Sequence, residues 1–206
     1  MNAIPVRDLG IFILAAGQSS RFGGCKLLAE VDGKPLLQHV IDQVSPLAPD
    51  DTYVLSGGWH SLMDLAFKEG TLSGAKLCYI PDWQQGMGSV IAQAAVNLAP
   101  MYQRILIALG DQVAIFESDF RQLALVSLNT DKIVCADYGD RLGAPAIFPR
   151  QFYVALSGLS GDNGARVLLN NEPEVMAVSL AKANIDIDTP GELEKWREDI
   201  TPTTDK

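Results

Sequence analysis

Residues 15–26 of the 206-residue sequence read AAGQSSRFGGCK and directly follow a run of apolar residues. Glycines let backbone N–H groups turn toward an anion, and the hydroxyls of Ser19 and Ser20 are further hydrogen-bond donors. Arg21 and Lys26 add positive charge that would neutralise a polyphosphate. The segment therefore has the composition of a phosphate-binding loop, although it contains neither GxxxxGK[ST] nor GxGxxG. An ordinary Gly-rich turn with two solvated cations explains the same residues.

A carboxylate follows a second apolar run, RILIALGDQV, at residues 104–113. Asp111 stands there after a glycine, where a carboxylate can hold Mg²⁺ against phosphates. The same residue type also caps helices. Both interpretations stay open.

Two further carboxylates alternate with isoleucines in IDIDTPGEL, at residues 185–193. The period of two puts Asp186 and Asp188 on one face of an extended segment, where they could join Asp111. Thr189, followed by Pro190 and Glu192, is equally typical of an ordinary helix start.

Two glycine-containing loops complete the candidates. In PDWQQGMGS, residues 81–89, Gly86 and Gly88 free the backbone, and Ser89 either lies near a base or ribose or caps a helix that runs from Val90. In SGDNGAR, residues 160–166, two glycines and Arg166 either cover a bound anion or form a structural turn with Asp162 as its cap.

Alternating strand and helix patterns must position these loops. We predict strands at residues 10–14, 52–56, 76–80, 104–109, 132–136, 145–148 and 175–180. We predict helices at residues 36–44, 60–68, 89–98, 117–128, 151–156, 163–170 and 191–199. Strands that are apolar throughout are typical of a sheet with helices on both faces. The pattern predicts one α/β domain over residues 1–206, a doubly wound, mostly parallel sheet whose ligands bind beyond the carboxyl ends of the strands.

Composition narrows the function classes. Sixteen Lys and Arg against 25 Asp and Glu leave a net charge of −9, which disfavours nonspecific binding to nucleic acid and to anionic membranes. Cys25, Cys78 and Cys135 are widely spaced, so we expect neither a disulfide framework nor a zinc site. No leader or membrane-spanning run is evident, and we expect a cytoplasmic protein. His39 and His60 fall in predicted helices, and we expect structural or surface roles for both.

Taken together and in this order, the motifs resemble the MobA-like nucleotidyltransferases and, within them, the MocA-like molybdenum cofactor cytidylyltransferases. The resemblance covers nearly the whole chain. It is carried by LAAGQSSRFGGCKLL at residues 14–28, GMGSVIAQA at 86–94, GDQV at 110–113, GAPAIF at 143–148, LSGDNGARVLL at 159–169 and DIDTPGEL at 186–193. It implies a Rossmann-like fold of the nucleotide-diphospho-sugar-transferase type.

The resemblance also implies a reaction and its residues. CMP would pass from CTP to the phosphate of molybdopterin with release of pyrophosphate and with Mg²⁺ as cofactor. The implied catalytic residues are Arg21, Lys26 and Asp111, and Mg²⁺ would be held by Asp111 with Asp188, Asp186 competing for the second place. The implied nucleotide-binding residues are Leu14, Ala15, Ala16, Gly17, Ser19, Ser20, Gly86, Gly88 and Ser89. Ala16, in place of the glycine of guanylyl-transferring relatives, favours CTP over GTP.

Two departures bear on the acceptor. MocA-like proteins usually carry GHP where this chain has Gly143, Ala144 and Pro145, and they usually carry a proline at Val113. The missing histidine leaves another phosphorylated acceptor, a sugar or polyol phosphate, as an alternative to molybdopterin. An NAD(P)H oxidoreductase of the same fold and a noncatalytic protein that delivers cofactor to a molybdoenzyme apoprotein are further alternatives. The first lacks support because no GxGxxG follows the first predicted strand.

Overall fold

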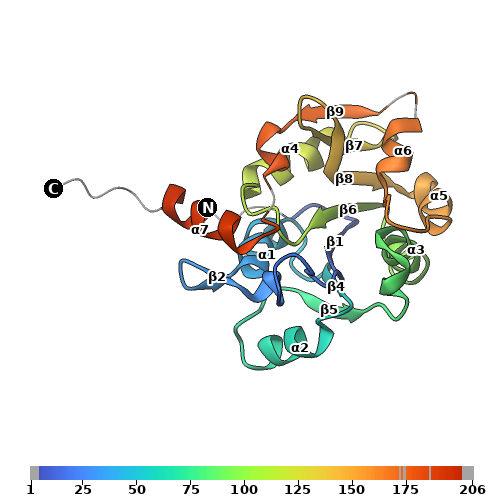
Figure 1. The fold of residues 1–206 in the computed structure, drawn as a ribbon. Coiled ribbons are helices and arrows are strands. Elements are labelled where there is room, and N and C mark those ends of the chain that lie inside the picture. The colour runs from blue at the N-terminus through green and yellow to red at the C-terminus, as the bar shows by residue number, and fades with distance from the viewer. Residues whose placement is uncertain (1–4, 172, 174, 186, 201–206) are drawn as a thin grey trace.

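A seven-stranded sheet in the order β5-β4-β1-β6-β8-β7-β9 forms the centre of the protein (Figure 1). The computed structural model describes residues 5–171, 173, 175–185 and 187–200. Within them the sheet strands are β1 (Leu9–Ala15), β4 (Thr52–Ser56), β5 (Lys76–Tyr79), β6 (Arg104–Leu109), β7 (Val134–Asp137), β8 (Leu142–Pro149) and β9 (Met176–Ser179). Of these strands only β8 runs antiparallel to its neighbours, β6 and β7. The predicted mostly parallel α/β sheet is confirmed.

Helices pack on both faces of this sheet. They are α1 (Leu36–Val44), α2 (His60–Lys68), α3 (Met87–Asn97), α4 (Glu117–Ser127), α5 (Tyr153–Ser157), α6 (Arg166–Asn171) and α7 (Pro190–Ile200). In Figure 1, α3 and α5 lie on one side of the sheet and α1 and α4 on the other. Side chains of β1 alternate between the two resulting cores: Ile11 and Ile13 pack with α1 and α4, whereas Phe12 packs with α3 and α5.

The described elements depart from the predicted ones at several places. A small hairpin of β2 (Glu30–Val31) and β3 (Lys34–Pro35) was not predicted, because its strands are too short to show a period. Strand β8 begins earlier than predicted, and its direction was not evident from a run that is apolar on both faces. Helix α3 begins at Met87, so Ser89 lies inside its first turn and is not its N-cap. None of the described helices is long and apolar enough to cross a membrane.

The carboxyl ends of β1, β4 and β6 are joined by backbone hydrogen bonds that bring their loops together. The Gly110 N–H donates to the Leu14 carbonyl at 3.1 Å, and the Gly58 N–H donates to the Ala16 carbonyl at 3.1 Å. The loop after β1 is therefore held between the loops that follow its two neighbouring strands. This is the edge at which ligands bind in open α/β sheets.

Close packing between Gly10 of β1 and the Tyr102 ring leads to a prediction about stability. A Cβ added at Gly10 would lie 2.4 Å from Cδ2 of Tyr102. That ring cannot turn aside freely, because its hydroxyl donates to Asp51 and is also hydrogen-bonded to the Tyr53 hydroxyl. We expect Gly10→Ala to lower the free energy of unfolding by about 1–3 kcal/mol, measured by urea denaturation. Gly191→Ala is the control, since a Cβ there meets nothing within 4 Å; an equal loss in both variants would contradict the overpacking argument.

Candidate functional site

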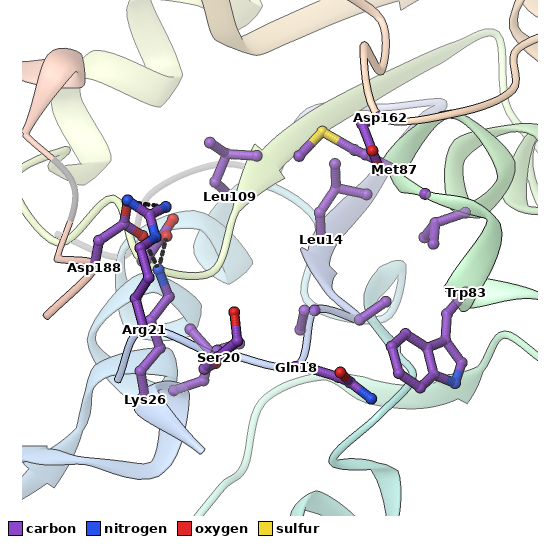
Figure 2. Close-up of a pocket in the computed structure, with 18 of the residues that line it drawn as sticks. Leu14, Gln18, Ser20, Arg21, Lys26, Trp83, Met87, Leu109, Asp162 and Asp188 are labelled. Atoms are coloured by element: carbon purple, nitrogen blue, oxygen red, sulfur yellow. Dashed lines mark hydrogen bonds and ion pairs between the residues drawn. The ribbon is translucent and has the colours of Figure 1, made fainter. Parts of the chain in front are cut away.

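A cavity of about 580 Å³ opens at the carboxyl ends of β1 and β6 (Figure 2). Most of the site residues predicted from the sequence line it, namely Leu14, Ala15, Ala16, Gly17, Ser19, Ser20, Arg21, Lys26, Gly86, Asp111 and Asp188. The lining residues that sequence reasoning did not assign are Gln18, Leu27, Trp83, Gln84, Met87, Val90, Leu109 and Asp162. In Figure 2, Arg21, Lys26 and Asp188 gather at one end of the cavity, and Trp83 and Gln18 lie at the other.

The charged end is built on one ammonium group. Lys26 Nζ lies 2.7 Å from Asp111 Oδ2 and 2.7 Å from Asp188 Oδ1. The second oxygen of Asp188 lies 2.6 Å from Arg21 Nη2 (Figure 2). The Lys26 side chain is 12% exposed, whereas that of Arg21 is 72% exposed. The four residues, named here the ion cluster, come from three segments that are far apart in the sequence.

Lys26 is positioned by the short 3-10 helix η1 (Lys26–Leu28) that ends the phosphate-loop candidate. The side chain of Leu27, next in the chain, is buried in the core between β1 and α1. Burying an aliphatic side chain of this size contributes roughly 1.5–3 kcal/mol, enough to fix the end of an otherwise glycine-rich loop. Lys26 is thereby held over the sheet edge, and Arg21 remains in the more exposed part of the loop.

Asp111 is positioned by its neighbours and not by a capping role. The N-cap of α4 is Phe116, whose backbone N–H donates to the Asp119 carboxylate at 2.8 Å. The next residue, Gln112, is 2% exposed, and its Nε2 donates to the carbonyls of Ala144 at 2.9 Å and Ala183 at 2.8 Å. Gln112 thus ties the Asp111 loop to β8 and to the segment that leads to Asp188. Sequence reasoning gave Gln112 no role.

Asp188 stands just before α7, and the predicted helix start is what holds it. Glu192 accepts the backbone N–H groups of Asp188 at 2.9 Å and Thr189 at 2.8 Å, while the Thr189 hydroxyl accepts the Glu192 N–H at 3.2 Å. This reciprocal pattern is a capping box. Ile187, 1% exposed, packs beside it in a small core of the β2–β3 hairpin. The capping and ligand interpretations of this segment are therefore compatible. Asp186 lies outside the described residues.

Residues 86–89, at the start of α3, pack against the segment of residues 160–162, and of the predicted site residues among them Gly86 lines the cavity. Gly88 and Ser89 are not among the residues that line the cavity. The Gly88 N–H donates to the Gly161 carbonyl at 2.7 Å, and a Cβ at Gly88 would lie 2.7 Å from the Ser160 backbone. The Ser89 hydroxyl, buried in the first turn of α3, donates to the Gln85 carbonyl at 3.4 Å. These glycines permit two loops to pack backbone to backbone, which places Asp162 in the cavity wall.

Proximity also shifts the protonation equilibria of the ion cluster. Burial alone would lower the pKa of Lys26, but the charge of Asp111 and the hydrogen bonds to Asp111 and Asp188 outweigh it, so the pKa lies above its ordinary value. The hydrogen bond from Lys26, with the positive charges of Lys26 and Arg21, lowers the pKa of Asp188 against the effect of burial. At neutral pH both groups are therefore charged.

The two carboxylates suit a divalent cation that arrives with a phosphate ligand. Mg²⁺ is commonly held by one or two carboxylates, and phosphates and waters complete its coordination. Asp111 and Asp188 converge on a single cationic nitrogen, so they already form a two-carboxylate cation site. Among the residues that the structure describes, no group of three or more His, Cys, Asp or Glu is suited to bind a metal alone. The two carboxylates thus fit a Mg²⁺ ion whose remaining ligands are phosphates and waters.

His60 has the structural role expected of it. Its Nδ1 is hydrogen-bonded to the Ser56 hydroxyl at 2.8 Å, and that hydroxyl donates to the Cys78 carbonyl at 3.1 Å. Ser56 is fully buried in β4, so the pair supplies no accessible nucleophile.

The lowered pKa of Asp188 predicts acid sensitivity. The folded-state pKa of Asp188 lies below its ordinary value of 3.8. Such a carboxyl group stabilises the fold at pH values above 3.8, and this stabilisation is lost as the pH falls through the folded-state pKa. Wild-type protein should therefore lose more free energy of unfolding between about pH 6 and about pH 3 than Asp188→Asn, in urea titrations at each pH. Asp131→Asn, at an exposed carboxylate, should behave like wild type. Equal losses in wild type and Asp188→Asn would contradict the assignment.

Comparisons with known proteins identify the family of this chain. The family model of the MobA-like NTP transferase domain matches residues 11–176. The bifunctional protein GlmU of Francisella philomiragia is 30% identical over 130 residues, which are 62% of this chain and 27% of GlmU. The chain thus matches only about a quarter of that curated relative's length.

Solved structures match over nearly the full length. Rv0371c from Mycobacterium tuberculosis H37Rv superposes with a TM-score of 0.80 at 25% identity, covering 95% of this chain and 100% of that one. Molybdopterin-guanine dinucleotide biosynthesis protein A from Archaeoglobus fulgidus gives a TM-score of 0.63 at 15% identity, covering 92% and 97%, a likeness of fold alone. The family model matches most of the residues of this chain, and the loop after β1 lines the central cavity. The chain belongs to the MobA-like nucleotidyltransferase family.

Proposed function

We propose that the protein is a Mg²⁺-dependent cytidylyltransferase that transfers CMP from CTP to the phosphate of molybdopterin. The observation that carries the proposal is the ion cluster: two cations and two carboxylates meet at the end of the cavity lined by the Gly-rich loop after β1. A triphosphate needs cations, and a phosphate-bound Mg²⁺ needs carboxylates. Both requirements are met within one site of a chain whose net charge is −9.

The reaction needs positioning more than it needs a protein nucleophile. An oxygen of the acceptor phosphate attacks the α-phosphorus of CTP and forms a P–O bond. The bond from that phosphorus to the oxygen bridging to the β-phosphate breaks, and pyrophosphate leaves with the electron pair. Lys26 and Arg21 would neutralise the charge of the triphosphate while the leaving group departs. This chemistry suits a cavity in which the described lining residues include no Cys or His.

Mg²⁺ would be held by Asp111 and Asp188 together with phosphate oxygens. When bound, it supplies charge neutralisation at the phosphates. Lys26 bridges both carboxylates in the structure, so nucleotide binding must draw its ammonium at least partly toward the triphosphate.

The choice of CTP rests on the wall formed by Ala15 and Ala16. Both line the cavity, and Ala16 is 8% exposed, with its carbonyl bound to the Gly58 N–H. A methyl group at this fixed position narrows the space beside the backbone compared with a glycine. We therefore assign the smaller pyrimidine base to the cavity.

A second acceptor class is supported by one observation. MocA-like proteins usually carry Gly-His at the positions of Gly143 and Ala144. In this protein the two residues line a second, smaller cavity that adjoins the first, and they provide no imidazole. Transfer to a sugar or polyol phosphate would need no histidine there. This remains the alternative acceptor.

Replacing Asp111 tests the proposed metal site. We expect Asp111→Asn to reduce pyrophosphate release from CTP and acceptor by about 100-fold or more, because the isosteric amide removes the negative charge. Circular dichroism should be unchanged, and Asp131→Asn should keep wild-type turnover. Wild-type, Mg²⁺-dependent activity in Asp111→Asn would refute the role of this carboxylate.

Nucleotide selectivity tests the base assignment. With Mg²⁺ present, CTP should raise the midpoint of thermal unfolding of the wild-type protein more than GTP does at equal concentration, because the ligand that binds the folded state more tightly stabilises it more. Ala16→Gly should reduce the difference between the two nucleotides. Stabilisation by GTP alone in the wild type would contradict the proposed CTP specificity.

A further inference from the structure

A small hydrophobic cluster is distinct from the two large cores on the faces of the sheet. Its buried residues are Val31 of β2, Leu36 of α1, Ile187 and Leu193, and none of them is more than 5% exposed. These four residues are named here the satellite core. The satellite core joins the β2–β3 hairpin to the segment that carries Asp188.

The loop with the two cations is attached to the satellite core. Phe22 directly follows Arg21, and its half-buried ring packs against the satellite core. The Phe22 N–H donates to the Ser19 carbonyl at 2.9 Å, which closes a turn in the loop. Ala29 also packs against the satellite core, and its N–H donates to the Lys26 carbonyl at 3.0 Å. Both cations therefore lie within three residues of an apolar anchor.

The two carboxylates are attached to the satellite core in the same way. Val113 packs against it, and the Val113 N–H donates to the Asp111 carbonyl at 3.0 Å. Ile187, 1% exposed within the satellite core, directly precedes Asp188. The segments that carry the ion cluster thus converge on one apolar cluster as well as on one ammonium group.

Helix α7 adds a second attachment between Asp188 and the hairpin. Leu193 belongs to the satellite core, and Trp196, one turn further along α7, packs against it. Arg197 Nε donates to the Glu30 carbonyl of β2 at 3.2 Å. In Figure 1, α7 lies beside β2. The helix that begins after Asp188 is therefore fixed to the hairpin that follows Lys26.

We propose that the satellite core is the positioning device of the site, and that Phe22 is a positioning residue that acts through it to hold the two cations in register with the two carboxylates. This inference rests on the nucleotidyl transfer proposed above. A triphosphate with Mg²⁺ would replace the direct pairs between Lys26 and the carboxylates, so those pairs could no longer hold the segments together. Apolar packing does not depend on which charges are paired, and it would keep the segments in place throughout.

Replacing Phe22 tests the proposal. In calorimetry with Mg²⁺ and without acceptor, Phe22→Ala should weaken CTP binding by about 10-fold or more. In turnover assays it should lower kcat/KM for pyrophosphate release by about 100-fold, with a lower kcat as well as a higher KM, because misplacement by about 1 Å has an effect of this size. Phe22→Leu should recover most of both, since an aliphatic side chain refills the space.

Phe152→Ala is the matched control. Phe152 is also a half-buried ring, but it packs against the core beside α3 and α5 and follows the end of β8 that pairs with the start of β6, away from the cavity. This variant should lose free energy of unfolding in urea and keep wild-type CTP binding. Unchanged CTP binding in Phe22→Ala, an equal loss in Phe152→Ala, or no recovery in Phe22→Leu would overturn the role of Phe22.

A milder pair of variants keeps the test valid if Phe22→Ala does not fold. Ile187→Val removes one methyl group beside Asp188 and should weaken CTP binding with Mg²⁺ while circular dichroism stays unchanged. Ile133→Val, at an isoleucine that is equally buried in another core, should bind CTP like wild type. Equal CTP binding by these two variants would overturn the positioning role of the satellite core.

Failure of the proposed function gives a different result. Wild-type protein that binds CTP with Mg²⁺ but releases no pyrophosphate with molybdopterin or a sugar phosphate would overturn the transfer reaction, while the binding comparison between variants would still decide this inference. Wild-type turnover in both Phe22→Ala and Ile187→Val would overturn this inference alone.

Discussion

The site depends on the two ion pairs of one ammonium group, that of Lys26. It is shared by Asp111 and Asp188, which lie 85 and 162 positions away in the sequence. Carboxylates this close together repel each other unless a cation lies between them. Lys26 therefore allows the loop after β1, the end of β6 and the start of α7 to meet, and it leaves at that point the charges that the proposed nucleotide and Mg²⁺ would need.

Hydrogen bonds and apolar packing in the surrounding structure keep the ion cluster in place. The capping box of Thr189 and Glu192 fixes the backbone at Asp188, and buried Ile187 fastens it to the β2–β3 hairpin. Gln112 bonds the loop of Asp111 to β8 and to the segment before α7. Because the cost of removing charges from water offsets much of their mutual attraction, packing and hydrogen bonding must supply the precision of the site.

Backbone contact between two loops builds a wall that the site shares with a second, smaller cavity of about 250 Å³. Gly86 and Gly88 let residues 160–162 approach the start of α3, and Asp162 becomes a wall common to both cavities. From the sequence, these glycines and Ser89 were interpreted as nucleotide contacts. Glycine permits close approach of a ligand and of another chain segment equally well, so local sequence does not distinguish these roles. The contribution of Trp83 was missed for a related reason, since its packing on Gly57 joins segments from two different loops.

The sequence by itself determined the elements and the chemistry of individual loops. Strands β4 and β6 and helices α1 and α2 have their predicted bounds, because hydrophobic periodicity and turn residues are local properties. The cationic Gly-rich loop and the carboxylates after β6 and before α7 were likewise evident from residue type and order. Only the tertiary structure decided which charges meet, that β8 reverses direction, and that a second cavity lies beside Arg166. These features depend on contacts between residues far apart in the chain, and side-chain periodicity carries no information about such pairings.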